Sequence, residues 1–550
     1  MVSATPATGP SIARPSMLPI EQGLHIAEQK APLTLDCDVV IVGSGAAGSV
    51  VAAELAESGQ RVLVLEEGPY LSAAALGAMR PSESMRRGWR EGGMTFAMAV
   101  GESPMINIMM GRCVGGSSLM TGGVCFRTPD EVLHEWVQGH GLSDLSSARM
   151  VPYFEEVERR SHVEKVPAEL RSRSTSLFMQ GAERLGYPMA DNERNTDGCC
   201  GCARCNFGCP HQAKLSVDLT YLPRAIAAGA RVLSDCRVES IVLQGEQAVG
   251  VCGRLLQQEG SDSVARRAFT VRARRVVLAA GAIHSAKLML DSGLGDGLPA
   301  LGRNLSVHPS LRVMARFDER VDGWNGALQS AHSLAFFHER LLLMSIFLPA
   351  GVLAATLPGI GLDHASRAAL APYMSVFGGM VHDDGGGRVH PTMSLRGLLG
   401  RVISREPVLS YELSGRDRRA LSRVLRLLCE TYLAAGAREV FLPILSGLQH
   451  FGVRPGPYGG LDADQLRRLD LDRIPAHLFE CASQHPLGTC RMGTSRDHAV
   501  IDDCGRVFGL RQLYVVDGGV LPTSLGVNPQ ISIMAMATRL AWRMREHPLP

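Results

Sequence analysis

Short apolar runs and small-residue helical stretches occur at both ends of the chain. Residues 39–42 are a β-branched run typical of a buried parallel strand, and the Ala-rich residues 49–58 predict a helix. Residues 61–65 predict the next strand. Near the other end, residues 513–516 have strand character, and a long apolar helix is expected from Pro529. Because both ends of the chain show this pattern of a short strand followed by an apolar helix, we predict one discontinuous α/β domain to which both ends contribute.

The middle of the chain carries less regular patterns. An amphipathic helical pattern runs through residues 129–160, and residues 271–281 predict another buried strand that leads into a helix at 282–292. The remaining expected elements are a helix at 219–228, a strand and turn at 230–243, and a basic amphipathic helix at 417–433 with a solvated outer face.

A glycine-rich loop follows the first predicted strand. Gly43, Gly45 and Gly48 have the G-x-G-x-x-G spacing: the first allows a tight turn, the second a close approach of backbone to a pyrophosphate, and the third close helix–strand packing. Glu66 ends the second strand, 21 residues after Gly45, where a carboxylate can accept hydrogen bonds from a ribose. This order of elements predicts a Rossmann-like dinucleotide site, with phosphates at the helix N-terminus.

Composition excludes several classes of protein. With 550 residues, 45% of them hydrophobic, the chain can form two or more globular domains. A formal net charge of +2 gives no case for a nucleic-acid partner, and 14 cysteines do not make a disulfide scaffold of this length. Residues 1–33 are rich in Pro, Ala and Ser and show no secretory signal. We therefore expect a flexible leader and a reducing, cytoplasmic setting.

One apolar segment complicates this assignment. Residues 341–362 carry no charge and are long enough to span a bilayer, but Pro349, Pro358 and several glycines interrupt a straight helix. The alternatives are a buried core segment or an apolar lid in peripheral contact with a membrane or lipid. A transmembrane helix is the alternative that we favour least.

The chain resembles the glucose–methanol–choline (GMC) flavoprotein oxidoreductases. The likeness runs from about Asp36 to the C-terminus and is carried by the glycine fingerprint, the loop GRCVGGSS, the run GAIHSAKLMLDSGLG, and the blocks HPLGTCRMG and VVDGGVLPTSLGVNP. The stretches FRTPDEVLHEW, GRNLSVHP and LGVNP, together with a cysteine-rich segment, are most similar to long-chain fatty alcohol oxidases and their bacterial relatives. The subfamily match is less specific than the family match.

The resemblance implies FAD rather than NAD in the dinucleotide site. The fingerprint and Glu66 would hold the adenosine diphosphate half, the second glycine-rich loop would lie along the flavin, and the Asp-Gly pair near the C-terminus would contact the ribityl and pyrophosphate region. The implied cofactor-binding residues are Gly43, Ser44, Gly45, Gly48, Glu66, Gly115, Gly116, Ser117, Val238, Asp517 and Gly518. Thr121 departs from the pattern, because many relatives have Asn there, and this puts one contact to the flavin in doubt.

The resemblance also implies a split fold, in which a discontinuous Rossmann-like FAD domain joins an α+β substrate domain built on an antiparallel sheet. We assign residues 34–310 to the FAD domain, including a cysteine-rich insert at 198–210. Residues 311–475 form the expected substrate domain, and residues 476–550 complete the FAD domain and the active site.

Alcohol oxidation moves a hydride from carbon to flavin and a proton from oxygen to a base, and a base that titrates near neutrality favours histidine. We expect His485 to be this base and Asn528 to hydrogen-bond the alcohol oxygen. Alone, a His before Pro is more often structural, and Asn528 could simply cap the helix that follows. The family blocks around both residues favour catalytic roles. We expect His284, His308 and His450 to be structural.

The cysteine-rich segment allows more than one interpretation. Cys199, Cys202, Cys205 and Cys209, followed by Pro210, have the C-x2-C-x2-C-x3-C-P spacing of bacterial ferredoxins, which ligates iron–sulfur clusters. Some dehydrogenase relatives carry a cluster near this region, whereas similar segments occur in alcohol-oxidising relatives not known for clusters. Four thiolates can also bind zinc. We favour reduced structural thiols and expect no metal site.

Together these features favour an FAD-dependent oxidase or dehydrogenase that acts on a primary or secondary alcohol, with a long-chain or otherwise apolar alcohol as its substrate. The electron acceptor stays open between oxygen, a quinone-type compound and an iron–sulfur centre. Sterols and polar alcohols stay open as substrates. A lyase or decarboxylase on the same fold is the alternative from another class of function.

Overall fold

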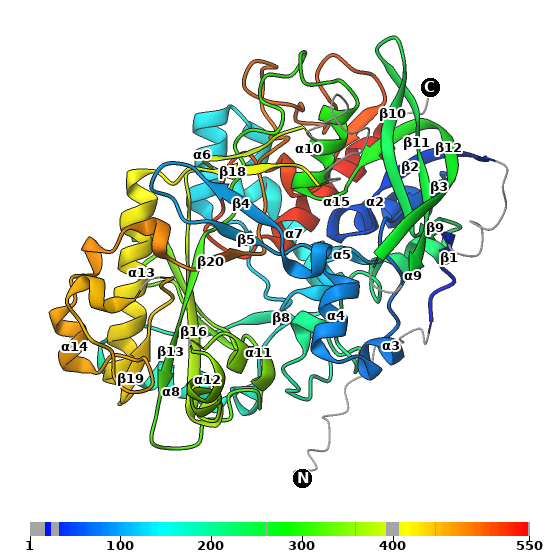
Figure 1. Cartoon of the computed structure of the whole chain (residues 1–550). Coiled ribbons are helices and arrows are strands. Elements are labelled where there is room, and N and C mark those ends of the chain that lie inside the picture. Colours follow the sequence, from blue (N-terminus) through cyan, green and yellow to red (C-terminus); the bar gives the residue numbers. More distant parts are fainter. Residues whose placement is uncertain are drawn as a thin grey trace, which may run out of the picture.

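The computed structural model describes residues 17–23, 32–259, 262–357, 359–391, 406–445 and 447–547. Two mixed sheets organise these residues, and a single buried apolar cluster extends through both. Figure 1 shows the first sheet at the upper right and the second at the lower left.

The first sheet has the strand order β1-β9-β3-β2-β12-β11-β10, with β21 paired to β12. Its strands are β1 (Glu21–Gln22), β2 (Leu33–Val42), β3 (Val62–Leu65), β9 (Arg231–Ser234), β10 (Cys236–Gln244), β11 (Gln247–Glu259), β12 (Asp262–Leu278) and β21 (Leu513–Val515). The pairs from β1 to β12 and the pair β12–β21 are parallel, whereas β12, β11 and β10 are antiparallel.

Both ends of the chain build this sheet, as the apolar pattern predicted. Helix α2 (Ala46–Glu57) is buried along nearly its whole length, and helix α15 (Gln530–Glu546) packs against it. In Figure 1 the blue α2 and the red α15 lie side by side. A helix that is apolar on all sides must be buried on all sides, and α2 is buried between α15 and the sheet.

Part of the segment expected to be a flexible leader is folded. Strand β1 pairs with β9, Leu18 is buried, and its backbone N–H donates to the Tyr70 hydroxyl at 3.0 Å. Residues 1–16 and 24–31 lie outside the described part of the chain.

The second sheet has the order β17-β18-β4-β5-β20-β13-β16-β15-β14-β7, with β19 paired to β13. Its strands are β4 (Phe96–Ala99), β5 (Ile106–Ile108), β7 (Ala190–Asp191), β13 (Ser310–Arg316), β14 (Ala331–Ser333), β15 (Leu341–Ser345), β16 (Met374–Val381), β17 (Gly387–Val389), β18 (Leu409–Tyr411), β19 (Glu439–Phe441) and β20 (Cys481–Ser483). Most pairs are antiparallel, but β18–β4 and β5–β20 are parallel, so the sheet is mixed.

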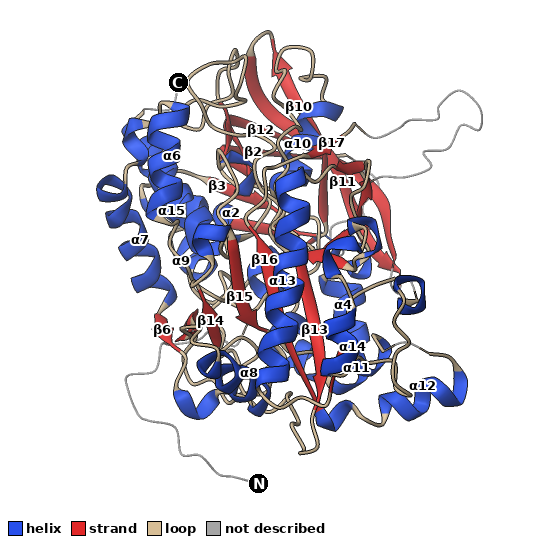
Figure 2. Ribbon diagram, turned by 90° about the vertical axis from the view of Figure 1, so that its left-hand side faces the viewer, coloured by secondary structure: helices blue, strands red, loops and turns tan. Residues whose placement is uncertain are grey.

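Helices cover this second sheet. Helix α13 (Gly415–Ala434) lies across β13 and β16 beside α8 (Arg173–Arg184), as Figure 2 shows. Ser414 and Asp417 form a capping box at the start of α13, and its leucines are buried against the sheet.

The other helices are α3 (Ala73–Ala78), α4 (Pro81–Gly88), α5 (Gly116–Met120), α6 (Asp130–His140), α7 (Ser147–Ser161), α9 (Tyr221–Ala227), α10 (Ala282–Asp291), α11 (Ala350–Ala355), α12 (Gly361–Ala368) and α14 (Ala463–Arg468). Strands β6 (Val163–Lys165) and β8 (Glu193–Asn195) form a separate pair.

Two stretches differ from the patterns in the sequence. The helical pattern of residues 129–160 is two helices, α6 and α7, because Gly141 adopts the left-handed conformation (φ 69°) that ends α6. The apolar segment 341–362 divides into β15, α11 and the start of α12. In the part of the chain that the structure describes, no helix has the length and apolar character needed to cross a membrane.

Candidate active site

A cavity of ≈ 780 Å³ opens beyond the carboxyl ends of β2 and β3. This is where ligands bind in doubly wound α/β sheets. The residues singled out from the sequence that line it are Gly43, Gly45, Glu66, Gly116, Ser117, Val238, His485, Asp517 and Gly518. Ser44, Gly48 and Gly115 do not line the cavity, but Ser44 contacts Glu66, Gly48 packs against Gly43, and Gly115 precedes Gly116 in the chain. Asn528 lies next to His485 and to the lining residue Pro529.

The first loop depends on glycine at two points. Gly43 has a φ of 104°, and a Cβ atom there would lie 2.4 Å from the Ala279 carbonyl oxygen. A Cβ atom on Gly48 would lie 2.0 Å from the Gly43 oxygen, so α2 could not approach β2 as closely. Gly45 caps α2 without a side-chain hydrogen bond, which leaves the N-terminus of the helix open to an anion from the cavity.

Glu66 ties the two glycine-rich loops together. Its Oε2 accepts hydrogen bonds from the Ser44 N–H (3.0 Å) and hydroxyl (2.7 Å), and its Oε1 accepts from the Gly68 N–H (2.9 Å). The Ser44 hydroxyl oxygen in turn accepts from the Gly115 N–H at 3.1 Å. Burial raises the pKa of Glu66, and these donors oppose the shift. The carboxylate expected at a ribose therefore also fixes the loop beside it.

The second loop touches the first. Gly115 and Gly116 have φ values of 89° and 54°, and a Cβ atom on Gly116 would lie 2.9 Å from the Gly45 Cα atom. The Ser117 hydroxyl accepts from the Gly111 N–H at 3.0 Å and so closes its own loop. Only glycine lets these two backbones meet at the cavity wall.

Asp517 closes the opposite wall. Its Oδ2 accepts from the Gly281 N–H (3.0 Å) and the Ser285 hydroxyl (2.5 Å), and its Oδ1 accepts from the Gly519 N–H (2.8 Å). Burial raises its pKa to about 6, against these three donors. The Asp-Gly pair near the C-terminus thus binds the loop that follows β12 and stands at the cavity.

Two further polar side chains contact His485. The Asn528 Nδ2 atom lies 3.3 Å from Nε2 of His485, and the His308 Nδ1 atom lies 3.2 Å from Nδ1 of His485. The His308 Nε2 atom accepts from the backbone N–H groups of Leu525 and Gly526, at 3.0 and 3.1 Å. His308, expected to be structural, therefore holds the imidazole of His485 against the segment that carries Asn528.

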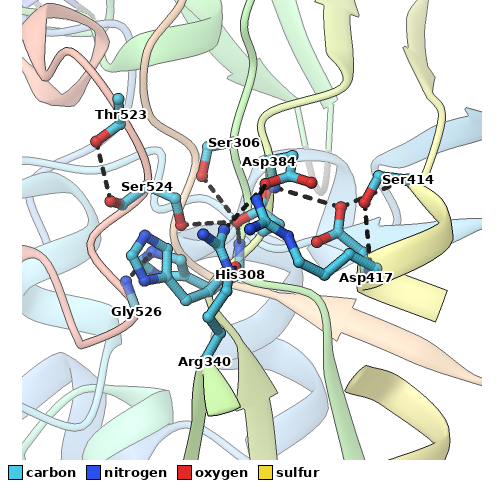
Figure 3. Close-up of polar contacts among 12 residues, drawn as sticks. Ser306, His308, Arg340, Asp384, Ser414, Asp417, Thr523, Ser524 and Gly526 are labelled. Atoms are coloured by element: carbon cyan, nitrogen blue, oxygen red, sulfur yellow. Dashed lines mark hydrogen bonds and ion pairs between the residues drawn. The ribbon is translucent and has the colours of Figure 1, made fainter. Parts of the chain in front are cut away.

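A buried carboxylate holds the segments beneath His485. Asp383 accepts hydrogen bonds from the His308 N–H (3.1 Å) and the Ser306 and Ser524 hydroxyls (2.9 Å each). The Val307 N–H and the Tyr411 hydroxyl also donate to it. Figure 3 shows His308, Ser306, Ser524 and Gly526 brought together from the two segments. The relative position of His485 and Asn528 thus depends on one carboxylate with five donors.

Burial keeps the imidazoles of this region neutral. It lowers the pKa of His308 to about 3, with a smaller contribution from His382. It also lowers the pKa of His485 well below the ordinary value, and His308 adds to this effect while Asp383 opposes it. A neutral imidazole can accept a proton, so the site suits a base.

Comparison with known proteins decides the family. The model of the GMC oxidoreductase family matches residues 37–310 with its N-terminal part and residues 403–537 with its C-terminal part, which together are most of the chain. The chain is a GMC oxidoreductase. It is therefore an FAD-dependent enzyme that acts on CH–OH donors.

Three proteins similar to this GMC oxidoreductase are instructive. An uncharacterised GMC-type oxidoreductase of Mycobacterium tuberculosis is 35% identical over 518 residues, which cover 94% of this chain and 77% of that protein. A long-chain-alcohol oxidase of Arabidopsis thaliana is 28% identical over 565 residues, covering 96% and 69%. The crystal structure of pyridoxine 4-oxidase from Mesorbium loti has a TM-score of 0.68 at 20% identity, covers 93% of this chain and 100% of that one, and shows the shared fold.

The cavity of this GMC oxidoreductase fits FAD. The N-terminus of α2, at the end of the first glycine-rich loop, is free to bind a pyrophosphate. Beside this N-terminus, Gly45 and Gly116 lie close together and no side chain projects between them. Arg112 also lines the cavity, and its buried Nε atom has no hydrogen-bond partner among the described residues. Such an unsatisfied donor is expected where a ligand supplies the acceptor.

A buried charge cluster at the cavity was missed in the sequence. Arg90 pairs with Glu67 (2.6 Å) and Glu406 (2.9 Å), and Glu406 also lies 2.9 Å from Nε2 of His284. Burial opposes ionisation of Glu67, but Arg90 outweighs it and lowers the pKa to about 2. All four residues line the cavity, so His284 belongs to the site, whereas His450 is exposed on a separate turn. No local pattern joins residues so far apart.

Two buried cations brace the end of α5. Lys214 Nζ donates to the carbonyl oxygens of Leu119 (2.6 Å) and Thr121 (2.5 Å), and Arg194 donates twice to the Gly122 oxygen. Arg194 also donates to the Cys205 sulfur at 3.0 Å. Burial raises the pKa of this thiol, but Arg194 and Lys214 outweigh it and lower the pKa. Cys205 thus has its own partner inside the protein.

Proposed function

We propose that this GMC oxidoreductase oxidises a long-chain or otherwise apolar primary or secondary alcohol to the aldehyde or ketone. The observation that supports this best is the contact of His485 with Asn528 at a cavity that carries the predicted cofactor residues. The bound FAD would supply the acceptor for the hydride.

The roles of the two polar side chains follow from their surroundings. His485 is neutral, because burial lowers its pKa, and we assign it the proton of the alcohol hydroxyl. The Asn528 Nδ2 atom lies 3.3 Å from Nε2 of His485, so its N–H groups are beside the proposed base. We assign Asn528 the hydrogen bond that Nδ2 donates to the substrate oxygen.

The apolar character of the substrate rests on similarity to the plant long-chain-alcohol oxidase. Each methylene buried on binding contributes about 0.8 kcal/mol, so a long alkyl chain binds without many polar contacts. Segment 341–362 gives little support, because Leu341, Leu342 and Leu343 belong to the buried core of the second sheet. Oxygen and a quinone-type compound remain the proposed electron acceptors.

Peripheral contact with a lipid surface is part of the same proposal. Ile360 and Leu362, at the start of α12, are each 91% exposed, and two large apolar side chains so fully in water are unusual at the tip of a turn. We propose this tip as the site of membrane contact.

Flavin bleaching under argon tests the proposal. Purified enzyme with bound FAD is mixed with alcohols from ethanol to long-chain alcohols and sterols, and the oxidised flavin absorbance is followed. We expect rapid bleaching by long-chain alcohols and little by ethanol or choline. If no alcohol bleaches the flavin, the proposed oxidation is wrong. Reoxidation by air and by a soluble quinone, measured separately, then identifies the acceptor.

A further inference from the structure

The cysteine-rich segment folds into a closed loop. Thr196 and Lys214 form a β-bridge at its base, and the Asp197 N–H donates to the Ala213 carbonyl at 2.8 Å. The two ends of the loop therefore lie side by side, although 16 positions separate Asp197 from Ala213. Residues near the start of the loop can thus meet residues near its end.

The first part of the loop is anchored to a distant segment. Gly201 accepts a hydrogen bond from the Gly326 N–H at 2.9 Å, and Cys202 forms a parallel bridge with Gly326. Gly201 and Ala203 both have positive φ values, 69° and 52°. A left-handed alanine is held only where the surrounding contacts determine it. Cys202 is therefore fixed between two sharply turned residues.

Three ligand-type side chains meet at the surface of this loop. The sulfur atoms of Cys200 and Cys202 and a ring nitrogen of His211 all lie within 4.8 Å of one another. Neither cysteine forms a disulfide bond. Zinc binds sulfur at about 2.3 Å and histidine nitrogen at about 2.0–2.1 Å, so two ligand atoms on one tetrahedral zinc lie about 3.5–3.8 Å apart. The three atoms are thus close to the spacing of a shared ion.

The set differs from the one that the ferredoxin spacing picks out. Cys200 and His211 fall outside that spacing, and Cys205, which belongs to it, is buried with its sulfur against Arg194. Sulfur and imidazole ligands in a tetrahedral arrangement suit zinc, whereas Mg²⁺ and Ca²⁺ prefer oxygen.

We propose that Cys200, Cys202 and His211 bind one zinc ion, with water in the fourth position. This site is independent of the proposed alcohol oxidation. None of the three residues lines the FAD cavity, so we assign the ion the role of holding this loop rather than a part in the oxidation. It links the two sides of the loop that carries Cys205, whose carbonyl accepts from Lys214, the residue that braces α5. The ion thereby steadies one wall of the FAD site from outside.

Metal analysis of the purified, FAD-loaded protein tests the site. Protein produced in zinc-supplemented medium should contain about one zinc per chain. Cys200→Ser and His211→Gln should each lose the zinc, while Cys199→Ser, a matched change in the same loop, should keep it. A far-UV circular dichroism spectrum equal to that of the wild-type protein shows that each variant is folded.

Cobalt gives a second readout. Cobalt-loaded wild-type protein should show the visible d–d bands of a tetrahedral thiolate site at wavelengths longer than the flavin absorbs, and Cys200→Ser should lack them. Wild-type protein without zinc, or a Cys199→Ser variant that loses zinc as completely as Cys200→Ser, would overturn the proposal. So would iron with acid-labile sulfide in place of zinc, because that result identifies an iron–sulfur cluster.

Discussion

The two halves of the proposed active site are built in different ways. The FAD half consists of backbone: Gly43, Gly48 and Gly116 lie where a single added methyl group would clash with neighbouring backbone. The alcohol half consists of side chains, in which His308 and Asn528 each contact His485, from 177 and 43 positions away. The residues of the FAD half follow from short local sequence patterns, whereas the residues of the alcohol half are brought together only when the chain folds.

The two halves should therefore respond differently to amino-acid substitution. A change in the backbone half should release the cofactor, because the loop geometry itself is the binding site. A change in the side-chain half should leave the cofactor bound and slow the reaction.

Replacing the base should abolish turnover without loss of flavin. For His485→Ala we expect the kcat for alcohol oxidation to fall by about 10²–10⁴-fold, the usual contribution of a positioned base, at unchanged FAD content. Steady-state rates and the flavin absorbance of the purified variant measure both quantities. The exposed His450→Ala is the control and should behave as the wild-type enzyme. Near-normal turnover of His485→Ala would remove the base from the proposed function.

Adding a side-chain atom in the first glycine-rich loop should instead reduce the amount of bound FAD. In Gly48→Ala the added Cβ would meet the Gly43 oxygen at 2.0 Å, which pushes α2 away from β2, so the protein should be purified with much less FAD. The control is Gly139→Ala in α6, where nothing lies within 4 Å of the added atom. That change should stabilise the helix by about 0.5–1 kcal/mol. A flavin-replete Gly48→Ala would contradict the backbone interpretation.

Weakening the buried carboxylate should affect stability and rate together. Asp383→Asn leaves five donors with a neutral, poorer acceptor, and we expect a loss of about 3 kcal/mol or more in the free energy of unfolding, with a lower kcat. Urea unfolding and steady-state kinetics check the two parts. The neighbouring Asp384 forms partly exposed pairs with Arg340 and Arg416, so Asp384→Asn should cost less than about 1 kcal/mol. Equal losses in both variants would show that Asp383 has no special role.

The smallest expected effect is that of pH on the rate. An ordinary imidazole, with a pKa of about 6.5, loses about three quarters of its neutral form between pH 8 and pH 6. Because burial lowers the pKa of His485, its neutral form persists over this range. We therefore expect kcat/KM to stay within about twofold from pH 8 to pH 6. A fourfold fall with a midpoint near the ordinary value would show that His485 is solvated or is not the base.

The sequence predicted the backbone half well, for a physical reason. Each of its constraints acts between neighbours: a β-branched strand, a turn that needs glycine, an Ala-rich helix and an acid at the end of the next strand. The same local signals placed α10 and β21 to within one residue, whereas β12 begins at Asp262, well before the strand predicted from residue 271. The two helices at 129–160 were merged because the pattern of buried residues continues across Gly141.

The side-chain half was predicted only in part. His485 and Asn528 were singled out by family blocks, whereas His308 was expected to be structural and instead contacts His485. Asp383 and Arg90 carried no signal, since their partners Ser524 and Glu406 lie 141 and 316 positions away. Burial of such groups depends on how the two sheets pack, and short-range patterns do not encode that packing.

The pairing of α2 with α15 has a consequence for biosynthesis. A ribosome releases α2 early, but the Asp-Gly turn that closes the far wall and the helix that covers α2 emerge 460 and 473 residues after its end, at Asp517 and Gln530. Until then the apolar surface of α2 that α15 covers stays exposed, and the proposed FAD site lacks the wall that Asp517 closes. Cofactor capture in this enzyme is therefore a late event in translation, and an interrupted message yields a chain that chaperones must shield.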